Sequence, residues 1–106
     1  MIVTLNKNNM DEVIGNATKP IVIDVFALWC GPCMSMKPSF EQLAEELAST
    51  HIFAEINVDE SRDLAINFNV TSVPTFIFIK DKQVVGREMG YMSKDDLKKH
   101  IEDYCS

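Results

Sequence analysis

The segment from Ile21 to Leu28 constrains the fold of this chain more than any other. Seven of its eight residues are apolar, several are β-branched, and the exception is Asp24. Such a short, nearly continuous apolar run is typical of a strand that is buried on both faces of a parallel sheet. The run ends just before Cys30-Gly31-Pro32-Cys33. We therefore expect a central strand of an α/β sheet with a cysteine pair at its carboxyl edge, where the sites of such sheets collect.

The spacing of apolar residues along the chain predicts the other elements. β-prone runs predict strands, and apolar residues three or four positions apart predict amphipathic helices. The resulting order, β-α-β-α-β-α-β-β-α, favours parallel crossover units followed by an antiparallel hairpin. We therefore expect an α/β fold with a mixed five-stranded central sheet and helices on both faces. The predicted strands are residues 2–5, 21–28, 52–58, 75–79 and 83–88, and the predicted helices are residues 8–17, 33–47, 61–68 and 93–105.

Length and composition fit one compact unit. The chain has 106 residues, of which 46% are hydrophobic and 25% are charged, as in ordinary globular domains. No internal repeat, low-complexity tract or Pro/Gly/Ser-rich linker divides it. We expect residues 1–106 to form a single domain and to act as a monomer.

The charge balance argues against two classes of partner. Ten Lys and Arg residues against sixteen Asp and Glu residues give a formal net charge of -6. A negative surface repels phosphate backbones and has little attraction for anionic lipid headgroups. No apolar run approaches the roughly 18 residues of a spanning helix. We therefore expect neither nucleic acid nor a membrane as a partner.

The three cysteines favour a redox pair over a disulfide framework or a metal site. Cys30 and Cys33 form one C-x-x-C motif, and Cys105 stands alone, unlike the dense cysteines of small secreted domains. A zinc site needs four ligands, and only Cys105, His51 and His100 could complete one, so we expect no metal. Polar residues interrupt the first twenty positions, so no signal-peptide core is present. We expect a cytoplasmic protein, although a secreted chain that had lost its leader would have the same sequence.

The C-x-x-C motif suits two-step thiol–disulfide exchange. Gly31 and Pro32 keep the connection short at a helix N-terminus, so we expect Cys30 to project as the exposed nucleophile and Cys33 to be buried in the first helical turn. A Cys30 thiolate attacks a substrate disulfide, and Cys33 then resolves the mixed disulfide. A free thiol with a pKa of about 8.5 is mostly protonated at pH 7. N–H groups of the first helical turn must therefore help to stabilise the thiolate.

Asp24 is the second unusual feature of the central strand. A carboxylate that is buried without a partner costs several kcal/mol, so we expect the pKa of Asp24 to be raised. The strand leads directly to the motif, and we expect Asp24 to accept the proton that Cys33 loses before it resolves. The alternative is a solvated or capped structural aspartate.

Two further residues flank the motif. Pro74, in Val73-Pro74-Thr75, begins the fourth strand at the edge where the motif lies. A proline there lacks an N–H, and a cis bond before it would leave the backbone of Val73 free to pair with an extended substrate. Trp29 stands beside the exposed turn, so we expect it to shield the motif or to dock a partner rather than to fill the core.

With these residues assembled, the chain resembles the thioredoxin family along its whole length. The resemblance implies a general protein disulfide reductase that has no bound cofactor and is itself reduced by a thioredoxin reductase that draws on NADPH. It also implies a cis bond before Pro74. The residues that carry the resemblance are Trp29-Cys30-Gly31-Pro32-Cys33, Asp24, Pro38, Val73-Pro74-Thr75 and Gly90. The apolar docking surface that it implies comprises Trp29, Gly31, Pro32, Val73, Pro74 and Gly90.

Four positions depart from the usual family pattern. Phe26 stands where a tryptophan is common, Met34 where a lysine often follows the second cysteine, and Lys82 where a glycine usually turns the hairpin. Glu55 occupies a position near the buried aspartate where a lysine is common. If Glu55 points at Asp24, two carboxylates about 5 Å apart repel by on the order of 3 kcal/mol and titrate as a coupled pair.

Two other functions stay open at this point. Disulfide oxidases and isomerases share this type of fold but usually carry a histidine between the cysteines, whereas Gly31-Pro32 is the reductase-type pair. A measured reduction potential separates these two functions. A binding subunit with incidental thiols is the other alternative, and its complexes would survive replacement of both Cys30 and Cys33 by serine.

Overall fold

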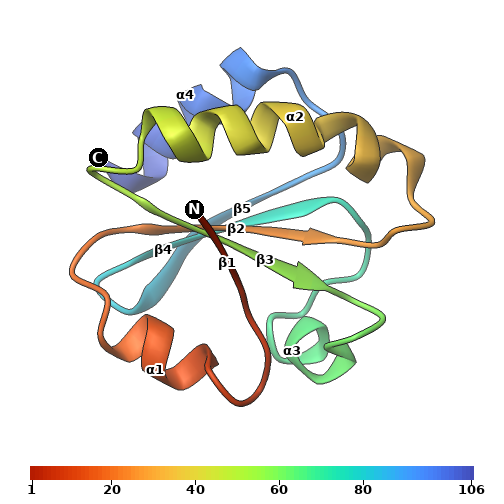
Figure 1. The fold of residues 1–106 in the computed structure, drawn as a ribbon, viewed down its shortest axis with the longest axis horizontal. Coiled ribbons are helices and arrows are strands. Elements are labelled where there is room, and N and C mark those ends of the chain that lie inside the picture. The colour runs from red at the N-terminus through yellow and green to blue at the C-terminus, as the bar shows by residue number, and fades with distance from the viewer.

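Five strands form one mixed sheet in the computed structural model, which describes residues 1–106 (Figure 1). The strands are β1 (Ile2–Thr4), β2 (Ile21–Phe26), β3 (Ile52–Asn57), β4 (Thr75–Lys80) and β5 (Gln83–Met89). Their order across the sheet is β1-β3-β2-β4-β5. β1, β3 and β2 are parallel, whereas β4 is antiparallel to β2 and β5 is antiparallel to β4. The predicted mixed five-stranded sheet is confirmed.

Helices cover both faces of the sheet, as predicted. They are α1 (Met10–Gly15), α2 (Gly31–Glu46), α3 (Arg62–Asn67) and α4 (Lys94–Cys105). α2 and α4 lie on one face, and α1 and α3 lie on the other (Figure 1). None of the four is both long enough and apolar enough to cross a membrane.

Alternate residues of β2 pack into two separate apolar clusters. Val22 packs with the residues of α2 and α4, whereas Ile21, Ile23 and Val25 pack on the side of α1 and α3. Successive side chains of a strand point to opposite faces. Asp24 therefore points to the same face as Val22, which is the face covered by α2.

β2 ends at Phe26, two residues before the predicted end. Leu28 lies in a turn and is 67% exposed, so its inclusion in the buried strand is wrong. An apolar side chain is buried only where another element covers it. Here the chain has already left the sheet and turned toward the cysteine motif.

The last helix begins and packs as its sequence predicts. Ser93 is the N-cap of α4, and its Oγ accepts a hydrogen bond from the Asp96 N–H at 3.1 Å. Cys105, in the last turn, is 4% exposed and packs into the core beneath α4. Burial raises the pKa of its thiol to about 11. Cys105 is therefore a protonated structural thiol at neutral pH.

The turn between β4 and β5 yields a prediction about stability. Asp81 and Lys82 have φ values of 53° and 68°, a region that costs a residue with a side chain about 1–2 kcal/mol and that glycine adopts freely. We predict that Lys82→Gly raises the free energy of unfolding by about 1 kcal/mol, measured by urea titration. Lys7→Gly, at an exposed turn residue without a positive φ, is the matched control and should bring no gain. Equal effects of the two changes would contradict the prediction.

Candidate active site

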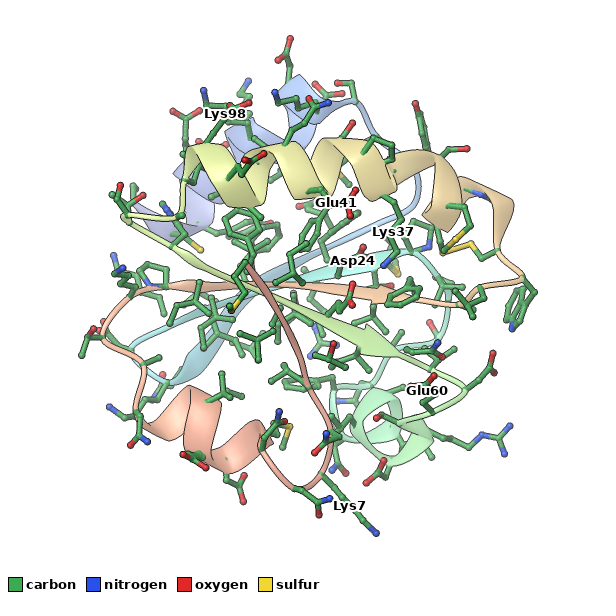
Figure 2. The ribbon with its side chains drawn as sticks, in the orientation of Figure 1. Lys7, Asp24, Lys37, Glu41, Glu60 and Lys98 are labelled. Carbon is green, nitrogen blue, oxygen red and sulfur yellow. A yellow bond between two sulfur atoms is a disulfide. The ribbon has the colours of Figure 1, made fainter.

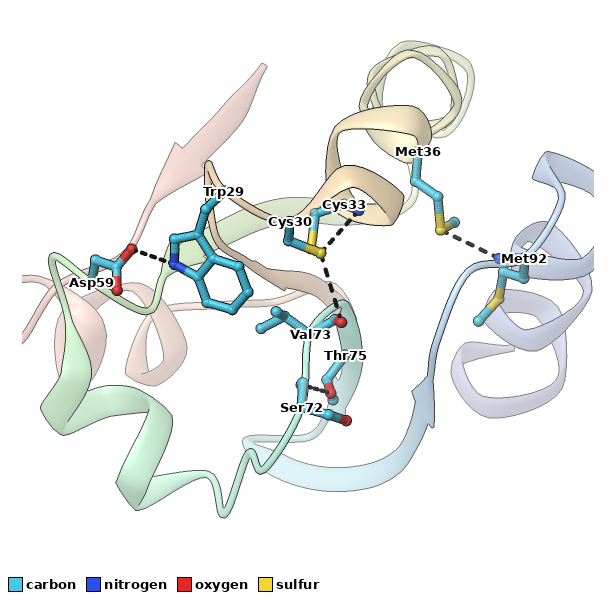
Figure 3. Close-up of a disulfide and its surroundings, with 9 residues drawn as sticks. All are labelled: Trp29, Cys30, Cys33, Met36, Asp59, Ser72, Val73, Thr75 and Met92. Carbon is cyan, nitrogen blue, oxygen red and sulfur yellow. Dashed lines mark hydrogen bonds between the residues drawn. A yellow bond between two sulfur atoms is a disulfide. The ribbon is translucent and has the colours of Figure 1, made fainter.

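The cysteine motif joins the end of β2 to the start of α2. Cys30 and Cys33 form a disulfide, and their Cα atoms are 5.3 Å apart (Figure 3). Cys30 is the N-cap of α2, and its Sγ accepts a hydrogen bond from the Cys33 N–H at 3.2 Å. Pro32 fits the first turn because a helix needs no N–H there. The N–H donor that the sequence predicts for the Cys30 sulfur is therefore present.

The two cysteines differ less in exposure than the sequence predicts. Cys33 is 1% exposed, as expected, but Cys30 is only 6% exposed. The Cys30 Sγ lies 3.7 Å from the Val73 carbonyl oxygen, and the side chain packs with Phe26 and Ala27. The prediction of an exposed Cys30 is thus corrected: the disulfide meets solvent mainly through a small part of Cys30.

The segment before β4 lies against the disulfide. The Val73–Pro74 peptide bond is cis, as the family resemblance implies. Pro74 itself is buried and Val73 is half-buried, so only Val73 of this pair presents a surface, which corrects the predicted docking surface. The Gly90 N–H donates a hydrogen bond to the Pro74 carbonyl at 2.8 Å, and this bond ties the end of β5 to the site. Gly90 has a φ of 93°, which glycine adopts freely.

Trp29 projects into solvent beside the disulfide (Figure 3). Its side chain is 72% exposed, and its Nε1–H donates a hydrogen bond to Asp59 Oδ2 at 3.0 Å. Gly31 and Pro32 are exposed as well, so Trp29 belongs to an open rim and does not fill the core. The sequence analysis missed Asp59. It follows β3, and the carboxyl ends of parallel strands meet at one edge, so its position could have been inferred.

Asp24 is buried on the face of β2 that α2 covers. It is 1% exposed, and neither carboxylate oxygen has a hydrogen-bond partner. The pKa of Asp24 is raised from its usual 3.8 to about 7. Burial is the largest cause, the charge of Lys37 lowers the pKa, and the charge of Glu55 raises it. The expected burial and raised pKa are confirmed, and the solvated alternative is wrong.

Lys37, which the sequence analysis missed, brings a cation to this site. Its Nζ lies 2.8 Å from Glu55 Oε2, and it reaches from α2 toward Asp24 (Figure 2). The charge of Glu55 is therefore compensated by Lys37, so Asp24 and Glu55 are not the uncompensated carboxylate pair that the sequence alone allows. One signal was available: Lys37 follows Cys33 by four positions in a helix, and such residues share a helix face.

The described residues offer no assembled metal site. No three His, Cys, Asp or Glu side chains are grouped so that they could hold a metal ion. Cys105 belongs to the core cluster beneath α4, whereas Cys30 and Cys33 belong to a separate cluster. The ligand set considered from the sequence is therefore not brought together.

Comparison with known proteins agrees with this geometry. The family model described as "Thioredoxin" matches residues 1–103. The chain belongs to the thioredoxin family. A thioredoxin of Chlorobaculum thiosulfatiphilum is 35% identical over 99 residues, which are 93% of this chain and 91% of the relative. A thioredoxin of Haemophilus influenzae is 33% identical over 103 residues, which are 97% of this chain and 96% of the relative. A thioredoxin of Alicyclobacillus acidocaldarius is 36% identical over 100 residues, which are 94% of each chain.

Family membership and the cysteine pair together define the chemistry. Thioredoxins are oxidoreductases that act on disulfides and work without a bound cofactor, and the Cys30–Cys33 pair stands at the expected place in this chain. The chain is therefore a thiol–disulfide reductase.

The raised pKa of Asp24 makes the stability of this thioredoxin-family chain depend on pH. The native state holds the Asp24 proton more tightly than the unfolded chain does, so this contribution is complete below pH 3.8 and is lost as the pH rises to about 7. Asp24→Asn removes the titration. We predict that the stability of the Asn variant relative to the parent rises by about 4 kcal/mol between pH 4 and pH 8.

Urea titrations at the two pH values measure this difference. Asp103→Asn, at an exposed position of α4, is the matched control and should show no such rise. A stability difference between the Asp24→Asn variant and the parent that stays constant with pH would contradict the prediction.

Proposed function

We propose that this chain is a general protein disulfide reductase of the cytoplasm. It acts as a monomer in which residues 1–106 form a single domain. A thioredoxin reductase that draws on NADPH reduces it after each turnover. The observation that carries the proposal is the placement of the cysteine pair. The Cys30 sulfur caps the N-terminus of α2, beside an open rim that includes Trp29. Gly31-Pro32 between the cysteines is the reductase-type pair in this family.

The first step forms a mixed disulfide at Cys30. The Cys30 thiolate attacks one sulfur of the substrate disulfide, the substrate S–S bond breaks, and the other substrate sulfur leaves as a thiolate. The Cys33 N–H, at 3.2 Å from Cys30 Sγ, and the N-terminus of α2 stabilise the attacking thiolate. These backbone donors are already in place in the folded chain.

The second step releases the reduced substrate. Asp24 takes the proton of the Cys33 thiol, the Cys33 thiolate attacks Cys30 Sγ, and the second substrate sulfur leaves as a thiolate. The substrate thus gains two electrons, and the two cysteines are oxidised to the disulfide. A pKa of about 7 for Asp24 supports this role, because a proton acceptor works best when its pKa is near the ambient pH.

Substrate docks along the rim around the disulfide. The Val73 N–H makes no backbone hydrogen bond within the chain, so it is free to pair with an extended substrate segment. The indole of Trp29, oriented by Asp59, offers apolar contact area beside the sulfur. The proposed docking residues are Trp29, Gly31, Pro32, Val73 and Gly90, with Pro74 acting through the orientation of Val73.

Alkylation of the reduced protein tests the roles of the cysteines. We predict that iodoacetamide at neutral pH labels Cys30 first, because Cys33 and Cys105 are more deeply buried and only Cys30 caps the helix. Mass spectrometry of the peptides identifies the labelled site. Faster labelling of Cys33 or Cys105 would overturn the assignment.

Variants of the two cysteines test the proposed reaction. In an assay that couples NADPH oxidation by thioredoxin reductase to reduction of a protein disulfide, we predict that Cys33→Ser and Cys30→Ser each abolish turnover. Only Cys33→Ser should accumulate protein mixed disulfides, because it attacks but cannot resolve. Cys30→Ser is the matched control, and mixed disulfides on that variant, or turnover by either one, would contradict the mechanism.

A further inference from the structure

Three charged side chains from three elements meet beneath α2. Asp24 of β2 and Glu55 of β3 are partners in the parallel register, so their side chains point to the same face. Lys37 comes from α2, and its Nζ pairs with Glu55 Oε2 at 2.8 Å. The side chains of Lys37 and Glu55 are each 23% exposed, whereas Asp24 is 1% exposed. The ion pair therefore lies between the buried carboxyl and solvent.

The ammonium of Lys37 is held in place by two contacts. Besides the pair with Glu55, Nζ lies 3.4 Å from the ring centroid of Phe26, and aromatic faces attract cations. Phe26 follows Asp24 by two positions in β2, so the two side chains share a face. Neither oxygen of Asp24 accepts a hydrogen bond. Lys37 therefore acts on Asp24 across space and not through a direct bond.

We propose that the Lys37–Glu55 ion pair is a positioning device that sets the protonation of Asp24, in which Glu55 holds the Lys37 ammonium near the Asp24 carboxyl but out of hydrogen-bond contact. The proposal rests on the proposed function of Asp24 as the proton acceptor for Cys33. A direct bond from Lys37 would hold Asp24 as a carboxylate that binds protons poorly. Without the cation, burial and the charge of Glu55 would keep Asp24 protonated.

Lys37 and Glu55 are the two charged side chains that influence the protonation of Asp24. Burial is the largest influence on the pKa of Asp24. On the other side of β2, β4 pairs Phe76 with Asp24 and contributes no charge there. α2 also carries Glu41, Glu45 and Glu46, but these side chains are exposed and are not among the groups that shift the pKa of Asp24. Cys33 of α2 is the proposed proton donor.

The ion pair also lies where protons can exchange with water. Lys37 and Glu55 line a surface pocket of about 320 Å³ together with Phe26. Glu60 lines the same pocket, which adds a second carboxylate on its wall. A change of charge in the pair therefore alters the surroundings of Asp24 without opening the core.

Two single variants should shift the titration of Asp24 in opposite directions. Lys37→Gln removes the cation and should raise the midpoint by about one pH unit, whereas Glu55→Gln frees Lys37 to bond Asp24 and should lower it by about one pH unit. The double variant should lie between the parent and Lys37→Gln, because the influence of Lys37 exceeds that of Glu55. The pH profile of disulfide reduction should move with these midpoints.

Carbon-13 NMR of the Asp24 carboxyl measures the midpoints in the full chain, and NADPH-coupled reduction of a protein disulfide measures the profiles. Lys94→Gln is the matched control, because it removes a lysine that pairs with Glu46 at the far end of α2, and it should shift neither quantity. Thermal unfolding of each variant checks that it is folded, and the oppositely directed shifts distinguish charge from a general loss of structure.

The outcomes separate this inference from the function on which it rests. Opposite shifts of the Asp24 midpoint support the positioning role. Unchanged midpoints, or shifts in the same direction, overturn it whatever the enzyme assay shows. If the midpoints shift as expected but the pH profiles stay in place, Asp24 is not the proton acceptor, and the positioning role has no consequence for catalysis.

Discussion

The burial of β2 between two layers of helices is the constraint on which the rest of the structure depends. All six residues of Ile21–Phe26 are buried, and β2 pairs with β3 on one side and β4 on the other. Apolar burial of this extent holds the strand rigidly. The point where the chain leaves the sheet is therefore determined, and with it the position of Cys30 at the start of α2.

The same burial creates the main energetic conflict of the molecule. Asp24 lies in the most buried strand without a hydrogen-bond partner, so its charged form opposes folding at neutral pH. The opposition is moderated by Lys37, whose charge favours the carboxylate. The chain thus keeps a carboxyl whose pKa of about 7 suits proton transfer, at a cost in stability that the apolar core offsets.

The fold was predictable from the sequence because its signals are local. Continuous and periodic apolar runs located every strand and helix, and the C-x-x-C motif of Cys30 and Cys33 indicated thiol–disulfide chemistry. The wrong predictions concern the exposure of side chains, which depends on whether a segment distant in the sequence covers them. Leu28 is exposed because no helix covers it, whereas Pro74 is buried and Cys30 is covered by the Val73 carbonyl, and no local pattern reports such contacts.

The sequence by itself determined the order of strands and helices along the chain, the presence of a C-x-x-C pair at Cys30 and Cys33, and the anomaly of a carboxyl in an apolar strand. Only the tertiary structure decided which charge compensates that carboxyl. Glu55 is separated from Lys37 by 18 residues along the chain, yet their charged atoms lie 2.8 Å apart. The reason is physical, because the Coulomb energy of two charges depends on the distance between them. The packing of α2 on the sheet sets that distance, and positions along the chain do not.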